Sequence, residues 1–314
     1  MTKKKRTFIS FDWALKHLLR EKANFDVLEG FISTVLKTDI KIHRLLESEG
    51  NKSRDDAKYN RVDLLAEDSG GDLLLIEVQG EPEFAYFQRM LFGASKLVTE
   101  YIDSGENYEH VKRVYSINIV YFDLGQGDDC VYIGKTEFYG LTTGDVLQLS
   151  PFQKQRFKAD TVSDLYPFYV ILKVNDFNRW SRDSLDQWLY FLATTDIPDD
   201  ADAPGLREAR EKLDRMRMGR DEGILYDRYL MDRAILRNQM ITARGEGYLD
   251  GVDHGMRDGL KKGLEQGLEQ GLEQGRTDEQ RRIVLAMMEK GLTAEQIASF
   301  TGIGVDEVVR LAKE

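Results

Sequence analysis

The chain has 314 residues, of which 41% are hydrophobic, so it is long enough for two domains or for one sizeable α/β core with an appendage. Its formal net charge of -11 excludes a protein that coats nucleic acid by charge alone, but not one that reaches DNA through a metal ion. The single cysteine, Cys130, excludes an intramolecular disulfide and a multi-cysteine zinc site. Because no apolar run is long enough for a signal sequence or a membrane span, we expect a cytoplasmic protein without membrane association.

The first half of the chain predicts an α/β core. Apolar residues spaced by three and four across 11–37 predict one or two amphipathic helices. Strands are predicted at 61–67, 72–79 and 113–122, with further strands around 129–139 and 167–175. Between the second and third strands, "EPEFAYFQRMLFGASKLVTEYI" predicts a helix with Pro82 in its first turn. The expected core covers residues 8–180.

From about residue 183 the pattern is helical and strand signals stop. We divide this part into a helical extension (181–245), a glycine-repeat segment (246–276) and a small helical bundle (277–314). Glycine recurs every four residues from 247 to 275, and each glycine but the last precedes a large apolar residue. Two such helices could approach closely along the glycines. The repeat therefore predicts either a homo-oligomerisation stalk or a low-complexity linker.

The last segment predicts three short helices that are broken at Gly291 and Gly302 and resemble a helix-turn-helix. Thr293 followed by Gln296 is typical of a capping box at a helix start. The final helix carries Asp306 and Glu307 among its charged residues, which makes a poor face for DNA phosphates. Packing or self-association is the favoured role of this bundle.

Two acidic residues occur in the apolar hairpin "VDLLAEDSGGDLLLIEVQG" at 62–80. In a regular antiparallel hairpin with its turn centred on Gly70, the residue numbers of cross-strand partners add up to about 140. Asp63 then lies opposite Glu77, and Arg61 lies opposite Gln79. The two-residue alternation of a strand puts all four side chains on one face of the sheet.

Two carboxylates about 4 Å apart repel by about 4 kcal/mol at an effective dielectric constant of 20. A shared proton could relieve this repulsion. A hard divalent ion such as Mg²⁺ fits the oxygen ligands better, because one or two carboxylates, waters and substrate phosphates commonly hold it. The alternative is a solvated acid pair that Arg61 or Arg89 neutralises.

Several motifs together resemble the Rpn family, the recombination-promoting nucleases or putative transposases of the PD-(D/E)XK nuclease superfamily. The motifs are "SFDWALKHLL", "RVDLLAEDSGGDLLLIEVQ", a helix with "FQRM", the strand "VYSINIVYF" and a tail of "GLEQG" units. The resemblance covers about residues 8–180. It implies a restriction-endonuclease-like α/β fold, with a central mixed sheet flanked by helices, and metal-dependent cleavage of DNA.

The resemblance also implies roles for individual residues. Asp63 and Glu77 match the two metal-binding acids, and Asp12 matches a recurring acid that completes the metal shell. Gln79 stands in the place of the superfamily's catalytic lysine, which leaves the site without that positive charge. We expect Arg61 to supply this charge.

Two further basic residues, Arg89 and Lys58, are candidates for binding phosphate. For Asp12, the alternative to metal binding is a cap or a dipole partner at a helix start. For Arg89, a surface arginine or one paired with a glutamate is as well supported as phosphate binding.

The predicted function is thus a Mg²⁺-dependent DNA endonuclease that acts in recombination, mobile elements or defence. Two alternatives remain open. One is a non-catalytic interaction protein that works through the glycine repeat. The other is a degenerate nuclease core that binds DNA without cutting it.

Overall fold

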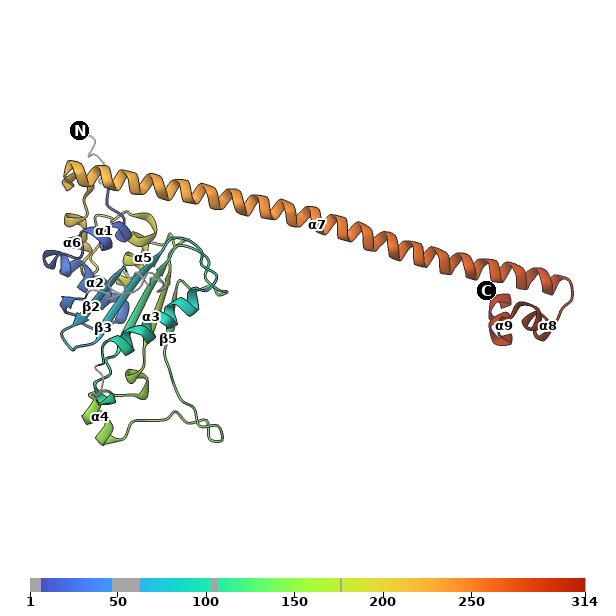
Figure 1. Ribbon diagram of the computed structural model, residues 1–314, viewed down its shortest axis with the longest axis horizontal. Helices are drawn as coiled ribbons and strands as arrows, with labels where there is room; N and C mark the ends of the chain where they lie inside the picture. Colours follow the sequence, from blue (N-terminus) through green and yellow to red (C-terminus); the bar gives the residue numbers. More distant parts are fainter. Residues whose placement is uncertain (1–6, 47–62, 103–106, 176, 314) are drawn as a thin grey trace. The chain divides into compact units, whose positions relative to one another are not determined.

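The structure, a computed structural model, describes residues 7–46, 63–102, 107–175 and 177–313. A six-stranded mixed sheet in the order β1-β2-β3-β4-β6-β5 forms its centre (Figure 1). Its strands are β1 (Ile42–Leu45), β2 (Leu64–Asp68), β3 (Leu73–Gln79), β4 (Val114–Val120), β5 (Val131–Gly134) and β6 (Phe168–Lys173). β3, β4 and β6 run parallel, whereas β1, β2 and β5 join the sheet in antiparallel pairs.

The helices of the described residues are α1 (Phe11–His17), α2 (Phe25–Leu36), α3 (Tyr86–Glu100), α4 (Pro151–Phe157), α5 (Ser184–Thr194), α6 (Leu206–Lys212), α7 (Arg220–Glu289), α8 (Ala294–Thr301) and α9 (Val305–Lys313). Some of them cover the two faces of the sheet. Short 3₁₀ turns lie at Lys22–Asn24, Tyr108–His110, Val162–Leu165 and Arg215–Arg217. None of the helices in the described ranges is long and apolar enough to cross a membrane.

One face of the sheet packs against α1, α2, α5 and α6. Phe11, Phe31 and Trp188 from three of these helices meet in an aromatic cluster with ring centroids 5.0–5.9 Å apart. The opposite face packs against α3, where Ala94 and Leu97 contact strand residues such as Leu75. The arrangement is the expected α/β fold, with a central mixed sheet between helical layers.

The hairpin of β2 and β3 has the predicted register. Leu64 lies opposite Ile76 and Ala66 lies opposite Leu74, so the partner numbers add up to 140. The Asp68 carboxylate closes the turn by accepting hydrogen bonds from the Gly70 and Asp72 backbone N–H groups. Gly71 has a φ of 91°, which a side chain would disfavour.

The predicted elements differ from the structure in places, among them the start of α3 and the edge strand β1. The helix expected from Pro82 begins at Tyr86, because residues 81–85 form a bend and a turn before it. The edge strand β1 was not predicted, since its four residues, "IHRL", carry no extended β-like run.

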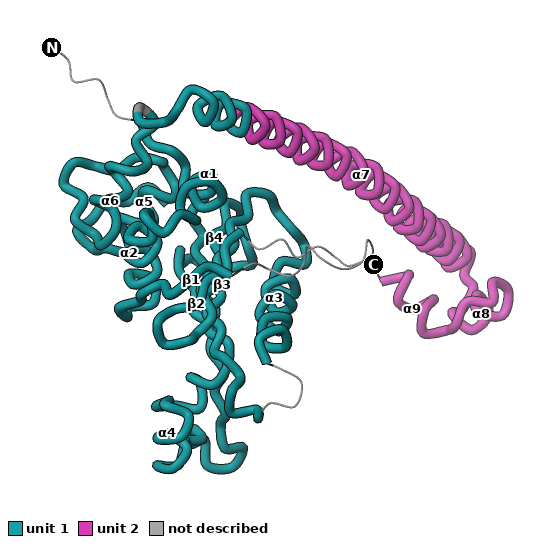
Figure 2. Tube along the Cα trace, turned by 60° about the vertical axis from the view of Figure 1, so that its left-hand side comes forward, with its two compact units in different colours: residues 1–229 teal, residues 230–314 magenta. Residues whose placement is uncertain are grey.

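The division of the chain also differs from the expected core at 8–180. The chain separates into two compact units, residues 1–229 and 230–314 (Figure 2). Trp188 on α5 and Leu206 on α6 are fully buried in the same core as the sheet. The segment at 181–213, expected as part of a separate extension, is thus integral to the first unit.

The helix α7 runs without a break through the glycine repeat. It has 70 residues, so the repeat and the last part of the expected helical extension, from Arg220 on, are one element. At its end, Val284 packs with Ile297 of α8 and with Val308 and Leu311 of α9. A capping box at Thr293 and Gln296 starts α8, as predicted, and Gly302 ends it with a φ of 73°.

Candidate active site

The hairpin register places Asp63 and Glu77 side by side. Asp63 immediately precedes β2, and its Oδ2 accepts a hydrogen bond of 2.7 Å from the backbone N–H of Val78 on β3. Leu65 and Leu75, two residues inward on the two strands, both pack on the α3 side of the sheet. The alternation of the strand puts Glu77 on that same side, and the hydrogen bond from Val78 holds the Asp63 carboxylate at the same end of the hairpin.

Both carboxylates are largely withdrawn from water. The side chain of Asp63 is 15% exposed and that of Glu77 is 9% exposed. Burial raises the pKa of the Glu77 carboxyl to about 7, and Arg89 opposes this rise while the nearby charge of Asp63 adds to it. Burial likewise raises the pKa of Asp63, against the opposing charge of Lys16. The two acids therefore favour a cation that compensates their lost hydration.

Helix α1 brings an acid and a base to this pair. Asp12 lies in its first turn, and Lys16 follows one turn later. The Lys16 ammonium lies 2.8 Å from Asp12 Oδ1 and 3.3 Å from Asp63 Oδ1, so it joins the two carboxylates. Just beyond α1, the Arg20 guanidinium donates to the backbone carbonyl of Asp63 at 2.6 Å.

Arg89, a candidate for phosphate binding, lies one turn into α3 and is paired with acids. Its guanidinium nitrogens lie 3.2 Å from Glu77 Oε2 and 2.9 Å from Glu83 Oε2. Its side chain is 30% exposed. Arg89 thus neutralises Glu77, and a phosphate contact would require it to exchange one of these carboxylates.

Gln79, which was predicted to be catalytic, lies two residues beyond Glu77 on the same face of β3. Its side-chain amide donates to the carbonyl of Glu81 at 3.0 Å. The predicted partner Arg61 and the candidate phosphate ligand Lys58 lie outside the described residues. The positive charges that the structure shows at Asp63 are instead those of Lys16 and Arg20.

Lys16 and Arg20 were not predicted as site residues, although their spacing gave a signal. Asp12, Lys16 and Arg20 recur every four residues, the spacing that places side chains on one side of a helix. The spacing alone could not show that this side faces Asp63, because that contact joins residues 47 positions apart, from 16 to 63.

Two polar residues near Glu77, Asn118 and Tyr86, were also not predicted as part of the site. Asn118 on β4 lies beside Glu77 in the parallel register and is buried. The Tyr86 hydroxyl, from the start of α3, donates to Asn118 Oδ1 at 3.4 Å. Burial raises the pKa of the Tyr86 hydroxyl, and the Glu77 charge adds to this rise, so Tyr86 stays a neutral donor beside the acids.

The structure does not assemble the three predicted metal ligands into one group. Within the described ranges, no three His, Cys, Asp or Glu side chains converge closely enough to hold a metal ion. The Lys16 ammonium is paired with both Asp12 and Asp63, so a lysine, and not a metal ion, joins these two carboxylates in the structure. The remaining pair, Asp63 and Glu77, still fits Mg²⁺, which one or two carboxylates with waters and phosphates can hold.

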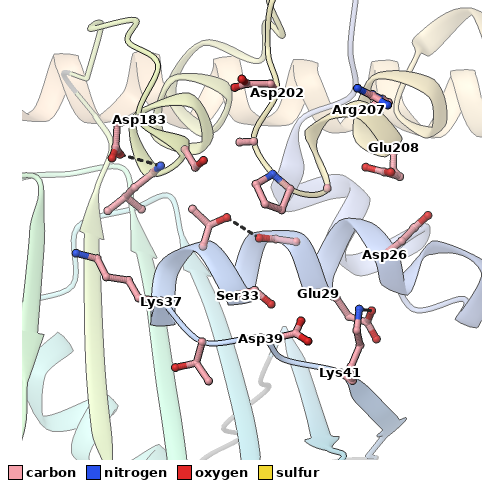
Figure 3. Close-up of a pocket in the computed structure, with 18 residues that line it drawn as sticks. Asp26, Glu29, Ser33, Lys37, Asp39, Lys41, Asp183, Asp202, Arg207 and Glu208 are labelled. Atoms are coloured by element: carbon pink, nitrogen blue, oxygen red, sulfur yellow. Dashed lines mark hydrogen bonds and ion pairs between the residues drawn. The ribbon is translucent and has the colours of Figure 1, made fainter.

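A larger groove, of about 810 Å³, lies elsewhere on the first unit, between α2 and the segments that begin α5 and α6 (Figure 3). Neither Asp63 nor Glu77 lines it. Its acids serve structural contacts: Asp183 caps α5, and Glu29 binds the Lys41 ammonium and the Ile42 N–H. These two acids of the groove are therefore engaged in contacts within the fold.

Comparison with known proteins agrees with this geometry. A family model described as PD-(D/E)XK nuclease family transposase matches residues 9–235. The match spans the whole sheet, α1 to α6 and the first turns of α7, which is well over half of the chain. No curated protein and no solved structure gave a significant match. The chain belongs to the PD-(D/E)XK nuclease family of transposases.

Proposed function

We propose that the chain is a divalent-metal-dependent DNA endonuclease that hydrolyses phosphodiester bonds. The observation that supports this proposal is the hairpin of β2 and β3, at whose end the Asp63 carboxylate is bound by the Val78 N–H, next to Glu77, with both carboxylates largely buried. Family membership supports DNA as the substrate. Mg²⁺ is the metal that the all-oxygen pair favours.

Asp63 and Glu77 would hold the metal ion. A divalent ion bound there supplies polarisation of the scissile phosphate and a lowered pKa of water, the chemistry that phosphodiester hydrolysis requires. Their carboxylates must both be ionised for this role, and the cations around them support that state: Lys16 at Asp63 and Arg89 at Glu77.

The positive charge of the site comes from α1. Gln79 cannot supply charge, and its amide is engaged by the Glu81 carbonyl. The Lys16 ammonium lies 3.3 Å from Asp63, and its side chain is 39% exposed, so it can also approach a phosphate oxygen. We assign to Lys16 the stabilisation of negative charge that was expected from Arg61, with Arg89 as a second phosphate ligand.

The test is nicking of supercoiled plasmid with Mg²⁺, Mn²⁺ or Ca²⁺ by the wild type and by Asp63→Asn and Glu77→Gln variants. Each variant should lose on the order of 100-fold or more in rate, as when one electrostatic catalytic group is removed. The matched control is Glu67→Gln on the same hairpin, whose carboxylate binds Arg44 and Lys112 away from the pair. A wild-type protein that cuts no form of DNA with any of these ions would overturn the proposal.

A second candidate is a DNA-binding protein that no longer cleaves. The engaged amide of Gln79 favours it, because the Glu81 carbonyl already takes one of the two N–H groups that this residue could offer to a phosphate. A wild type that binds DNA in the presence of Mg²⁺ without nicking it would establish this second function.

We also propose that the protein self-associates through the glycine-repeat part of α7. The large apolar residues after the glycines are exposed, among them Leu260, Leu264 and Leu268. A methyl group added at any of the repeat glycines would meet no atom within 4 Å, so this side of the helix is open to a second copy.

A further inference from the structure

The first turns of α7 contact the helix that carries Asp12 and Lys16. The Tyr226 hydroxyl accepts a 2.9 Å hydrogen bond from the backbone N–H of Ser10, the residue before α1. Its ring packs against Trp13 of α1 in an edge-to-face contact with centroids 5.3 Å apart. One turn later, the Tyr229 hydroxyl donates to Asp12 Oδ2 at 2.5 Å.

The two oxygens of Asp12 therefore have different partners. Oδ2 binds the Tyr229 hydroxyl, and Oδ1 binds the Lys16 ammonium at 2.8 Å. Rotation of this carboxylate would break the hydrogen bond from Tyr229 or the ion pair with Lys16. Since Lys16 also reaches Asp63, an unbroken series of polar contacts runs from α7 to the carboxylate pair.

Packing alone does not account for the Tyr229 hydroxyl. The ring of Tyr229 stacks on that of Tyr226 with centroids 6.0 Å apart and an interplanar angle of 21°. A phenylalanine ring could make the same stack. The hydroxyl adds a directed bond to an acid whose side chain is only 13% exposed.

We infer that Tyr229 is a positioning residue of the active site: it fixes the Asp12 carboxylate, which in turn holds the Lys16 ammonium against Asp63. The inference rests on the proposed nuclease function. It makes the beginning of α7 part of the catalytic machinery, so the helix that carries the glycine repeat starts at the site.

The first test compares full-length wild type with the Tyr229→Phe variant in plasmid nicking at saturating Mg²⁺. Because loss of an outer hydrogen bond to a catalytic group commonly costs 10- to 100-fold, we expect kcat to fall about tenfold. The KM for DNA should change little, since the stacked ring remains. The control is Tyr248→Phe, an exposed tyrosine farther along α7. Equal kcat for Tyr229→Phe and wild type would overturn the inference.

A second test needs no nuclease activity. Thermal unfolding in EDTA is measured for Tyr229→Phe, Asp12→Asn and the double variant. If the hydroxyl acts through Asp12, the double variant should shift the midpoint by clearly less than the sum of the two single shifts. Additive shifts would overturn the inference even if the wild type cuts DNA. If the shifts are non-additive but the wild type cuts no DNA, the coupling of Tyr229 to Asp12 stands and the proposed nuclease function is rejected.

Discussion

At the scale of single residues, the site departs from a simple carboxylate pair because Lys16 binds Asp63 directly. An ammonium and a metal ion compete for the same oxygen, since both are attracted by its negative charge. The same ammonium also serves the reaction if it stabilises the phosphate. Lys16 therefore has opposite effects on metal affinity and on turnover.

This opposition gives a prediction for Lys16→Met. Without the ammonium, Asp63 should bind Mn²⁺ or Mg²⁺ more tightly, as calorimetry would measure, while kcat for DNA nicking falls on the order of 100-fold. The matched control is Lys41→Met, since Lys41 forms a comparable 3.0 Å pair with Glu29 on α2. Tighter metal binding with unchanged kcat would show that Lys16 only neutralises the acids.

Asp72, in the hairpin turn, gives a prediction of pH dependence. Burial raises the pKa of its carboxyl to about 6, and the nearby charge of Asp68 adds to the rise. A carboxyl whose pKa is higher in the folded than in the unfolded state favours folding when protonated. The stability it contributes is complete below about pH 4 and is lost as the pH rises through 6.

Asp72→Asn should therefore leave the protein more stable than the wild type at pH 8, with the advantage vanishing near pH 4. Because part of the side chain reaches water, we expect a gain of only about 1 kcal/mol at pH 8. Urea unfolding at both pH values measures it. An equal difference at the two pH values would show that the carboxyl does not titrate between them.

At the scale of elements, the hairpin was the most predictable part of the chain. Its register follows from alternation and from the position of the Gly-Gly turn, and both are local in sequence. The start of α3 was placed four residues too early, because Pro82 fits a first turn as well as it fits the bend that precedes the helix. The contact of α1 with the hairpin could not be predicted, since no local pattern encodes which surface a helix covers.

The close approach of α2 and the start of α6 is a second contact that no local sequence pattern predicts. A Cβ at Gly30 of α2 would lie 2.4 Å from the backbone nitrogen of Gly205, the residue before α6. Gly205 has a φ of 78°, so its backbone is already constrained. Two backbones that meet so closely leave no room for a methyl group.

Gly30→Ala should accordingly lower the free energy of unfolding by about 1–3 kcal/mol, the usual cost of overpacking. The control is Gly263→Ala in α7, where an added methyl group meets no atom within 4 Å. There the alanine should raise helix stability by about 1 kcal/mol. Chemical denaturation of both variants measures the difference, and a Gly30→Ala variant as stable as the wild type would refute the packing argument.

At the scale of the whole molecule, the sequence separated the nuclease core from the helical remainder but placed the boundary near 180. The composition changes there because strands end, yet α5 and α6 still bury their apolar faces in the core of the sheet. A change from strands to helices is thus a weaker sign of a domain boundary than the point at which side chains stop packing into the core. In this chain the two units divide within α7, after Tyr229.

The residues of the glycine repeat beyond that point are exposed, so packing within the chain does not explain a helix of this length. Eight glycines at 247–275 each cost about 1 kcal/mol relative to alanine in a helix interior. The leucines beside them, Leu260, Leu264, Leu268 and Leu272, are between 66% and 77% exposed. Association of two or more copies would bury these leucines and offset the cost of the glycines.

Light scattering coupled to size exclusion should therefore find the wild type as an oligomer, and the double variant Leu264→Gln with Leu268→Gln as a monomer. Because both residues lie outside the first unit, the monomer should keep its metal-dependent nicking rate per chain. The paired control, Glu265→Gln with Glu269→Gln, alters neighbouring positions but leaves the apolar side chains intact, so it should stay oligomeric. A monomeric wild type would leave the repeat as a linker, and an oligomer that survives the leucine changes would place the interface elsewhere in the chain.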